Sequence, residues 1–236
     1  MTASIVIDPS PSEVEQDRAQ RTIVFVDYQN VYRSARDAFG LHAENARLGN
    51  VRPYALGRQM MRDGGQLEQV RVYTGVHTPQ RGAKLHAMMQ RRISAWITAM
   101  PDKVEVFPRP LSYSGGKPTE KGVDVEIAID FVRLAMDDAY DTAYLLSADT
   151  DLVPAVKFVA DRFPEKRLVM VGYLADDGCD APAPLDLAGG GVERRFMTKR
   201  DFERARDDVD YFQPSADQSG DIDGGRWTRV MSRMKR

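Results

Sequence analysis

The stretch Thr22-Ile23-Val24-Phe25-Val26-Asp27 decides how the rest of this chain is interpreted. It is a run of β-branched and aromatic residues that ends at a carboxylate. Apolar residues at consecutive positions predict a strand that is covered on both faces of a sheet. Ligands of an open α/β sheet bind outside the carboxyl ends of its strands. Asp27 therefore stands where a functional side chain is expected.

The same alternation of apolar runs and helical patterns continues along the chain. Further strands are predicted at residues 70–74, 104–107, 143–146 and 167–171, and helices at residues 30–39, 53–62, 80–100, 124–136 and 152–163. Residues 192–197 and 199–205 have the composition of an added edge strand and a short helix. Strands that alternate with helices imply right-handed crossovers. The predicted fold is α/β, a three-layer α/β/α sandwich with a central, mainly parallel sheet of about five strands.

Length and composition agree with one domain. The 236 residues are enough for a single α/β domain, and 42% of them are hydrophobic, which predicts a substantial core. We expect residues 1–20 to be a flexible N-terminal arm, residues 21–205 to be the domain, and residues 206–236 to be a mobile C-terminal extension. The sequence leaves a homo-oligomer open.

Several classes of protein are excluded or disfavoured. The net charge of −2 argues against capture of nucleic acid by the whole surface, although a local basic patch remains open. One cysteine excludes an intramolecular disulfide and a zinc site built from cysteines. No apolar run approaches the roughly 20 residues of a membrane span. Residues 1–20 lack the pattern of a signal peptide, so a soluble cytoplasmic protein without membrane contact is expected.

Four aspartates stand at positions that a parallel sheet brings together. Asp27, Asp149 and Asp151 follow predicted strands, and Asp124 lies at a helix start. Carboxylates placed together repel one another unless a cation intervenes, and oxygen ligands suit Mg²⁺ or Mn²⁺. The set predicts a site for one or two such ions. Each aspartate alone also suits a helix N-cap, and Asp151 in particular competes for the helix that begins at Leu152.

Other polar residues near these ends have simpler roles or serve as phosphate contacts. Asp130 lies about 240° around its helix from Asp124, which predicts a structural role. The loop at residues 114–119 lacks the spacing of a phosphate-binding loop. The side chains expected to contact a phosphate are Arg81, Lys84, Lys117 and Lys121, and Tyr28 is expected to stack on a flat ring of a ligand.

Three segments, in this order along the chain, resemble NYN domains, which are relatives of the PIN-like nucleases. They are Ile23-Val24-Phe25-Val26-Asp27-Tyr28-Gln29-Asn30, Lys121-Gly122-Val123-Asp124 and Ser147-Ala148-Asp149-Thr150-Asp151-Leu152. The likeness covers roughly residues 20–172. Tyr28-Gln29 replaces the common Gly-Ser, Ala148 replaces Gly and Leu152 replaces Phe. No departure removes a carboxylate, although the changes after Asp27 bear on how a substrate fits.

This resemblance implies a PIN-like fold and metal-dependent cleavage of RNA. By motif, the metal ligands are Asp27, Asp124, Asp149 and Asp151, the residue that orients the site is Asn30, and the neighbouring or phosphate-contacting residues are Lys121 and Ser147. The expected activity is that of an endoribonuclease that uses Mg²⁺ or Mn²⁺ to hydrolyse phosphodiester bonds.

Two other functions remain open at this point. Residues 144–153 also loosely fit a haloacid-dehalogenase-like phosphatase, in which Asp149 is a nucleophile that forms an aspartyl phosphate. That motif comes late in the chain and leaves Asp27 and Asp124 unexplained. The third alternative is an RNA-binding or regulatory module that binds metal but does not cleave.

Overall fold

A single parallel sheet forms the middle of the molecule. The computed structural model describes residues 20–61, 65–176 and 191–213. The strands are β1 (Arg21–Asp27), β2 (Gln66–Val76), β3 (Val104–Pro110), β4 (Thr142–Leu146), β5 (Arg167–Tyr173) and β6 (Val192–Met197). They form a six-stranded sheet in the order β3-β2-β1-β4-β5-β6, with every pair parallel. The α/β prediction is confirmed, and β6 is the added edge strand predicted at residues 192–197.

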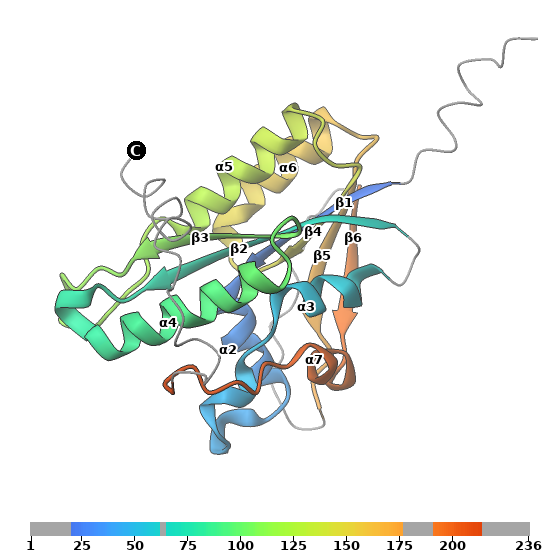
Figure 1. Ribbon diagram of the computed structural model, residues 1–236. Coiled ribbons are helices and arrows are strands. Elements are labelled where there is room, and N and C mark those ends of the chain that lie inside the picture. The colour runs from blue at the N-terminus through green and yellow to red at the C-terminus, as the bar shows by residue number, and fades with distance from the viewer. Residues whose placement is uncertain (1–19, 62–64, 177–190, 214–236) are drawn as a thin grey trace, which may run out of the picture.

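Helices cover both faces of this sheet (Figure 1). They are α2 (Tyr28–Ala38), α3 (Pro53–Met60), α4 (Pro79–Ala99), α5 (Val123–Met136), α6 (Val153–Arg162) and α7 (Lys199–Ala205), with 3-10 turns η1 (Leu41–Ala43), η2 (Ala46–Gly49) and η4 (Thr150–Leu152). α5 and α6 lie on one face, and α2, α3, α4 and α7 lie on the other. The three-layer sandwich is therefore confirmed.

The central strand β1 shows why both faces are apolar. Successive side chains of a strand point to opposite faces. Val24 and Val26 accordingly join the core under α2 and α4, while Ile23 and Phe25 join the core under α5 and α6. All four are at most 3% exposed. A strand with this pattern is stable only between two layers of helices.

The strand order reverses around β1 and β4, which places the candidate residues side by side. β2 lies on one side of β1 and β4 on the other. Val26 pairs with Leu146 in the register of β1 and β4, so the residues that follow, Asp27 and Ser147, leave the sheet at neighbouring points. This is the position at which open α/β sheets bind ligands.

The predicted domain boundary after Ala205 does not coincide with the end of packing. Asp207 is 1% exposed and accepts hydrogen bonds from Trp96 Nε1 at 3.1 Å and from the Tyr211 hydroxyl at 3.0 Å. Residues 206–213 thus pack against α4. The rest of the predicted extension, and residues 1–19 of the predicted arm, lie outside the described residues. In the part of the chain that is described, no helix is both long and apolar enough to cross a membrane.

Asp130 has the structural role that its position on α5 predicts. It accepts hydrogen bonds from Arg71 Nη2 at 2.6 Å, from the Tyr73 hydroxyl at 2.9 Å and from Arg133 Nη2 at 3.0 Å. Burial opposes ionisation of Asp130, but the bonds from Arg71 and Arg133 outweigh it and hold the pKa of the carboxyl below its usual range. The ionised side chain therefore ties β2 to α5 beneath the helix layer.

Candidate metal centre

Asp27 ends β1 and also begins α2. Its Oδ1 accepts the backbone N–H of Asn30 at 3.1 Å, which is an N-cap bond, and its Oδ2 accepts the Ser147 hydroxyl at 3.1 Å. The side chain is 8% exposed. Capping and a place at the sheet edge are thus not alternatives here, because one carboxylate does both.

Asn30 and Ser147 connect the ends of β1 and β4. Asn30 Oδ1 accepts the backbone N–H of Ala148 at 3.1 Å and the Ser34 hydroxyl at 3.2 Å. The Ser147 hydroxyl also accepts the backbone N–H of Asp149 at 3.2 Å. These bonds fix the loop that carries Asp149 relative to Asp27. Ser147 is 2% exposed, so it positions this loop and is too buried to contact a phosphate.

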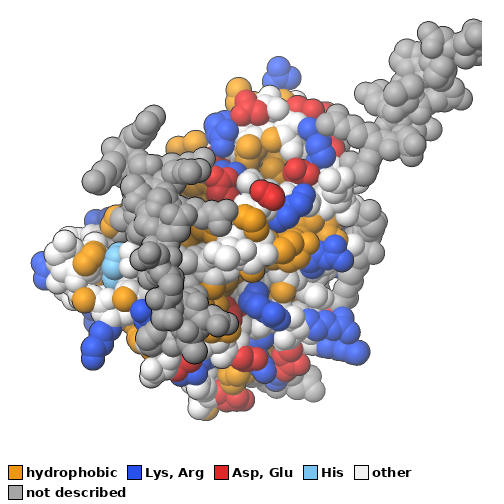
Figure 2. All heavy atoms as spheres, in the orientation of Figure 1, with side chains coloured by type: hydrophobic (Ala, Val, Ile, Leu, Met, Phe, Trp, Pro, Cys, Tyr) orange, Lys and Arg blue, Asp and Glu red, His pale blue; other side chains and the backbone are white. Residues whose placement is uncertain are grey.

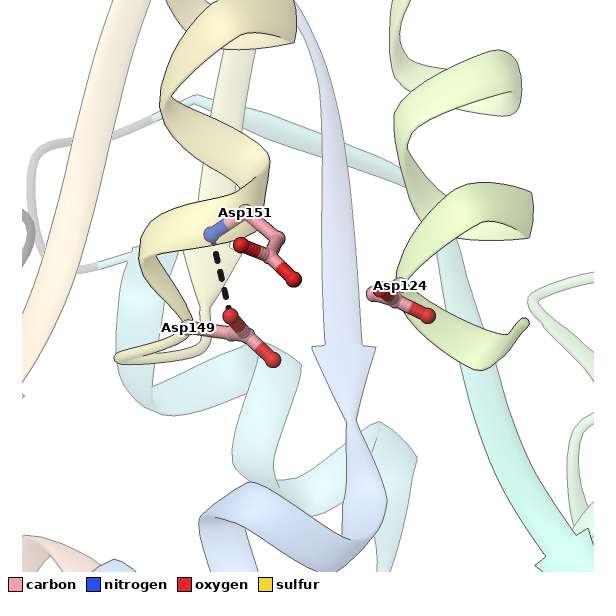
Figure 3. A group of neighbouring side chains, drawn as sticks. All are labelled: Asp124, Asp149 and Asp151. Carbon is pink, nitrogen blue, oxygen red and sulfur yellow. Dashed lines mark hydrogen bonds between the residues drawn. The ribbon is translucent and has the colours of Figure 1, made fainter. Parts of the chain in front are cut away.

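Asp124, Asp149 and Asp151 face one another at this edge (Figure 3). Asp149 and Asp151 lie at η4, after β4, and Asp124 lies in the first turn of α5. One carboxylate oxygen from each residue lies within 4.8 Å of the others. Asp149 and Asp124 are half-buried and Asp151 is exposed. Two segments distant in sequence, the first turn of α5 and the turn η4, thus supply three converging carboxylates.

The residue that caps the helical turn after β4 is Asp149, and not Asp151 as the sequence predicted. Asp149 Oδ1 accepts the backbone N–H of Asp151 at 3.0 Å and caps η4. The expectation that Asp151 competes as a cap for the helix at Leu152 is wrong, because the 3-10 turn moves the capping position two residues toward β4. The Asp151 carboxylate therefore projects toward Asp124 (Figure 3).

The three carboxylates suit a small divalent cation. Oxygens bound to one octahedral ion at about 2.1 Å lie about 3 Å apart at adjacent positions and about 4.2 Å apart at opposite ones, by geometry from that bond length. The spacing of at most 4.8 Å needs little adjustment to match. Within the described residues, no Lys or Arg forms an ion pair with Asp27, Asp124, Asp149 or Asp151. The donor set therefore fits Mg²⁺ or Mn²⁺.

Asp27 lies beside this cluster and responds to its charge. Burial raises the pKa of Asp27 to about 6, with further contributions from the negative charges of Glu120 and Asp149, against the lowering effect of the bonds from Asn30 and Ser147. Asp27 is not one of the three residues with mutually close oxygens. It is a fourth carboxylate at the edge of the cluster.

These features have a counterpart among known proteins. Residues 21–174 match the family model described as the NYN domain. The chain belongs to the NYN domain family. This family has a PIN-like, nuclease-like fold, and the resemblance expected from the three sequence motifs is confirmed.

Other comparisons add little to this assignment. A crystal structure of a protein of unknown function from Vibrio parahaemolyticus is similar, with 18% identity and a TM-score of 0.49, over 79% of this chain and 96% of that one. No curated protein matches the chain. The family assignment thus rests on the NYN model alone.

Two charged residues of the NYN domain near this centre, Glu120 and Arg33, are not predicted by any sequence motif. Glu120 Oε1 accepts the backbone N–H of Gly75, at the end of β2, at 2.5 Å. Burial raises the pKa of Glu120, partly offset by that bond and by the positive charge of Arg33 on α2. A Cβ at Gly75 would lie 2.6 Å from Glu120 Cγ, so glycine is needed for this approach. Only the fold brings these residues to the edge beside Asp27.

The predicted phosphate contacts divide into two groups. Arg81, Lys84, Lys117 and Lys121 are exposed, as a phosphate contact requires. Tyr28 is 4% exposed and its ring packs against Trp96 and beneath the Arg92 guanidinium. The expected stacking of a base on Tyr28 is therefore not met in this structure, because α4 covers the ring.

The raised pKa of Asp27 predicts a dependence of stability on pH in the metal-free NYN domain. The folded pKa of about 6 exceeds the ordinary value of 3.8, so the folded protein holds the proton more tightly than the unfolded chain. This stabilisation is fully present below pH 3.8 and is lost as the pH rises through about 6.

The variant Asp27→Asn removes this ionisation. In EDTA we expect it to be more stable than the wild type by about 2 kcal/mol near neutral pH, since two pKa units correspond to about 3 kcal/mol and one hydrogen bond is lost. Near pH 4 the advantage should vanish. Urea unfolding at both pH values measures this difference, and an equal difference at the two would contradict it.

Proposed function

We propose that this NYN domain is a metal-dependent endoribonuclease, which hydrolyses phosphodiester bonds of RNA with Mg²⁺ or Mn²⁺ at the acidic centre. One observation carries the proposal. Three carboxylates without a lysine or arginine partner among the described residues converge within 4.8 Å at the carboxyl edge of a nuclease-like sheet. Such a concentration of negative charge favours a divalent cation.

The side chains of the chain itself have distinct parts in this proposal. Asp124, Asp149 and Asp151 bind one or two ions, with Asp27 as an additional ligand. Asn30 and Ser147 hold the loop of Asp149 against β1. When bound, a divalent ion lowers the pKa of its water and offsets charge at the phosphate. The rigid frame keeps the carboxylates in place as a substrate approaches.

RNA is the proposed substrate, in single strands or loops. Exposed cations such as Lys117 and Lys121 would hold the phosphate backbone. Blue basic and red acidic side chains are interspersed on the face drawn in Figure 2. That mixture of charges, with the net charge of −2, fits weak attraction of RNA by this face and local contacts at the centre. A cytoplasmic location and a homo-oligomeric state of this protein are also proposals.

The test is cleavage of end-labelled single-stranded RNA by the purified protein in Mn²⁺, in Mg²⁺ and in EDTA. We expect internal cleavage with either metal and none in EDTA. RNA binding without cleavage under all three conditions would instead identify the non-cleaving RNA-binding module. Release of phosphate from p-nitrophenyl phosphate with trapping on Asp149 would identify the phosphatase.

A further inference from the structure

A hollow lies on the face of the sheet that α2 and α4 cover, opposite the face covered by α5, which carries Asp124. It has a volume of about 330 Å³ and lies at the carboxyl end of β2, between α2, α4 and residues 209–212. Ligand sites of proteins are concave, mostly apolar, and start at about this volume. The residues that line it include Tyr32, Thr74, Leu85, Arg92 and Phe212.

The hollow is close to Asp27 along both the chain and the sheet. Tyr28 and Gln29, which line it, directly follow Asp27. Thr74 also lines it, and its predecessor Tyr73 pairs with Asp27 across β1 and β2. Neighbouring strands are about 4.8 Å apart. A chain of nucleotides with one phosphate at the carboxylates can therefore place an adjacent nucleotide over the hollow.

The walls of the hollow combine flat apolar surface with a buried cation. Leu85, Met88 and Met89 line it from α4, and Tyr32 and Phe212 supply rings. Arg92 is 7% exposed and its Nη1 donates to Asn50 Oδ1 at 3.2 Å. Among the described residues, Arg92 forms no ion pair, and its Nε has no hydrogen-bond partner. The guanidinium lies over the rings of Tyr28 and Trp96, 4.8 and 5.1 Å from their centroids, so aromatic rings and not a carboxylate hold this positive charge at the wall of the hollow.

The segment at residues 206–213 completes the hollow. Asp207 fixes it to Trp96, and Arg47 Nη2 bonds Asp210 Oδ2 at 2.7 Å. Arg91 Nε donates to the Tyr211 carbonyl at 2.7 Å. These bonds hold the Phe212 side chain, which is 50% exposed, at the rim. An aromatic ring held at the mouth of a site is a surface on which a base can stack.

We propose that this hollow binds the base of a nucleotide next to the scissile phosphate, and so contributes to the choice of cleavage site. The proposal rests on the endoribonuclease function above. The aromatic and aliphatic walls contact the faces of the base, while the amide and guanidinium groups hydrogen-bond its edge. The occupant is a planar, hydrogen-bonding ring attached to a phosphate chain.

The test combines a protein change with an RNA change. Leu85 is 37% exposed at the hollow, so Leu85→Trp fills the space without altering the core. In an Asp149→Asn background with EDTA, we measure the affinity for a fluorescent single-stranded RNA decamer and for decamers with one abasic position each. We expect Leu85→Trp to weaken binding of the intact RNA about tenfold, as the loss of one stacked base would.

The abasic RNAs distinguish a filled site from a general disturbance. One of the abasic decamers should bind about tenfold more weakly than the intact decamer to the Asp149→Asn protein that keeps Leu85. Adding Leu85→Trp should weaken the binding of that abasic decamer no further, because both changes remove the same contact. Ala83→Trp, an exposed change on α4 away from the hollow, is the matched control and should leave affinity unchanged. Phe212→Ala should weaken binding from the opposite wall.

The proposal would be overturned if the Asp149→Asn proteins with and without Leu85→Trp bound every RNA with equal affinity. Additive losses at all abasic positions would also overturn it. In the active protein, Leu85→Trp should also change the distribution of cleavage positions, and an unchanged distribution would contradict the inference. Failure of the nuclease function itself is separate, because it appears as absence of cleavage by the wild type while binding in EDTA is still measured.

Discussion

Replacement of Asp149 by asparagine is expected to lower Mn²⁺-dependent RNA cleavage by at least about a thousandfold and to leave the protein folded. The change removes one negative charge from three converging carboxylates. A bound metal supplies several kcal/mol of transition-state stabilisation, and a loss of about 4 kcal/mol corresponds to that factor. The asparagine carbonyl can still accept the backbone N–H of Asp151, so η4 keeps its cap.

The matched control is Asp161→Asn, an exposed carboxylate on α6 with the same change of charge. It should cleave at the wild-type rate. Both rates are measured with end-labelled RNA in Mn²⁺, and thermal unfolding in EDTA checks folding. Wild-type cleavage by Asp149→Asn would contradict the assignment of the centre. Equal loss in both variants would mean that total charge, and not the cluster, sets the rate.

Replacement of Asp130 by asparagine is expected to have the opposite profile. Arg71 is 5% exposed, and Asp130 accepts its Nη2 at 2.6 Å. Removal of one partner from a buried ion pair leaves the other charge uncompensated and costs about 3 kcal/mol, toward the lower end of such changes because Glu105 still pairs with Arg71. Urea unfolding should show this loss, with RNA cleavage by the folded fraction retained.

Asp137→Asn is the control for this variant, because Asp137 also pairs with Arg133 but is exposed. Its effect should be below about 1 kcal/mol. If Asp130→Asn instead unfolds at the wild-type urea concentration and loses cleavage, then Asp130 belongs to the centre and the separation of roles along α5 is wrong.

The fold was predictable from local pattern because the strands are buried on both faces. The consecutive apolar residues of β1, and the matching run of β4, leave no polar face that could be exposed to water. The bounds of β2 were not predictable, because Gln66, Glu68 and Gln69 are polar and this end of the strand forms by pairing with β1. The sixth strand was foreseen as an edge, where composition constrains pairing less.

The positions of Asp149 and Asp151 were predictable because an apolar run marks the strand that precedes them, and that of Asp124 because a helical pattern begins there. Glu120 and Arg33 were not, since only the close approach at Gly75 brings Glu120 to β2. The burial of Tyr28 depends on Trp96 and Arg92, about seventy positions away along the chain. The polar sequence around Asp207 predicts a mobile segment. The burial of Asp207 was not predictable because it depends on the hydrogen bond from Trp96, which is distant in sequence.

The most direct test of the central claim is the anomalous scattering of a crystal soaked in Mn²⁺. We expect a peak between Asp124, Asp149 and Asp151, with Asp27 at its edge, and loss of that peak in Asp149→Asn crystals. A soaked wild-type crystal with no anomalous peak at these carboxylates, at a Mn²⁺ concentration that supports RNA cleavage, would contradict it.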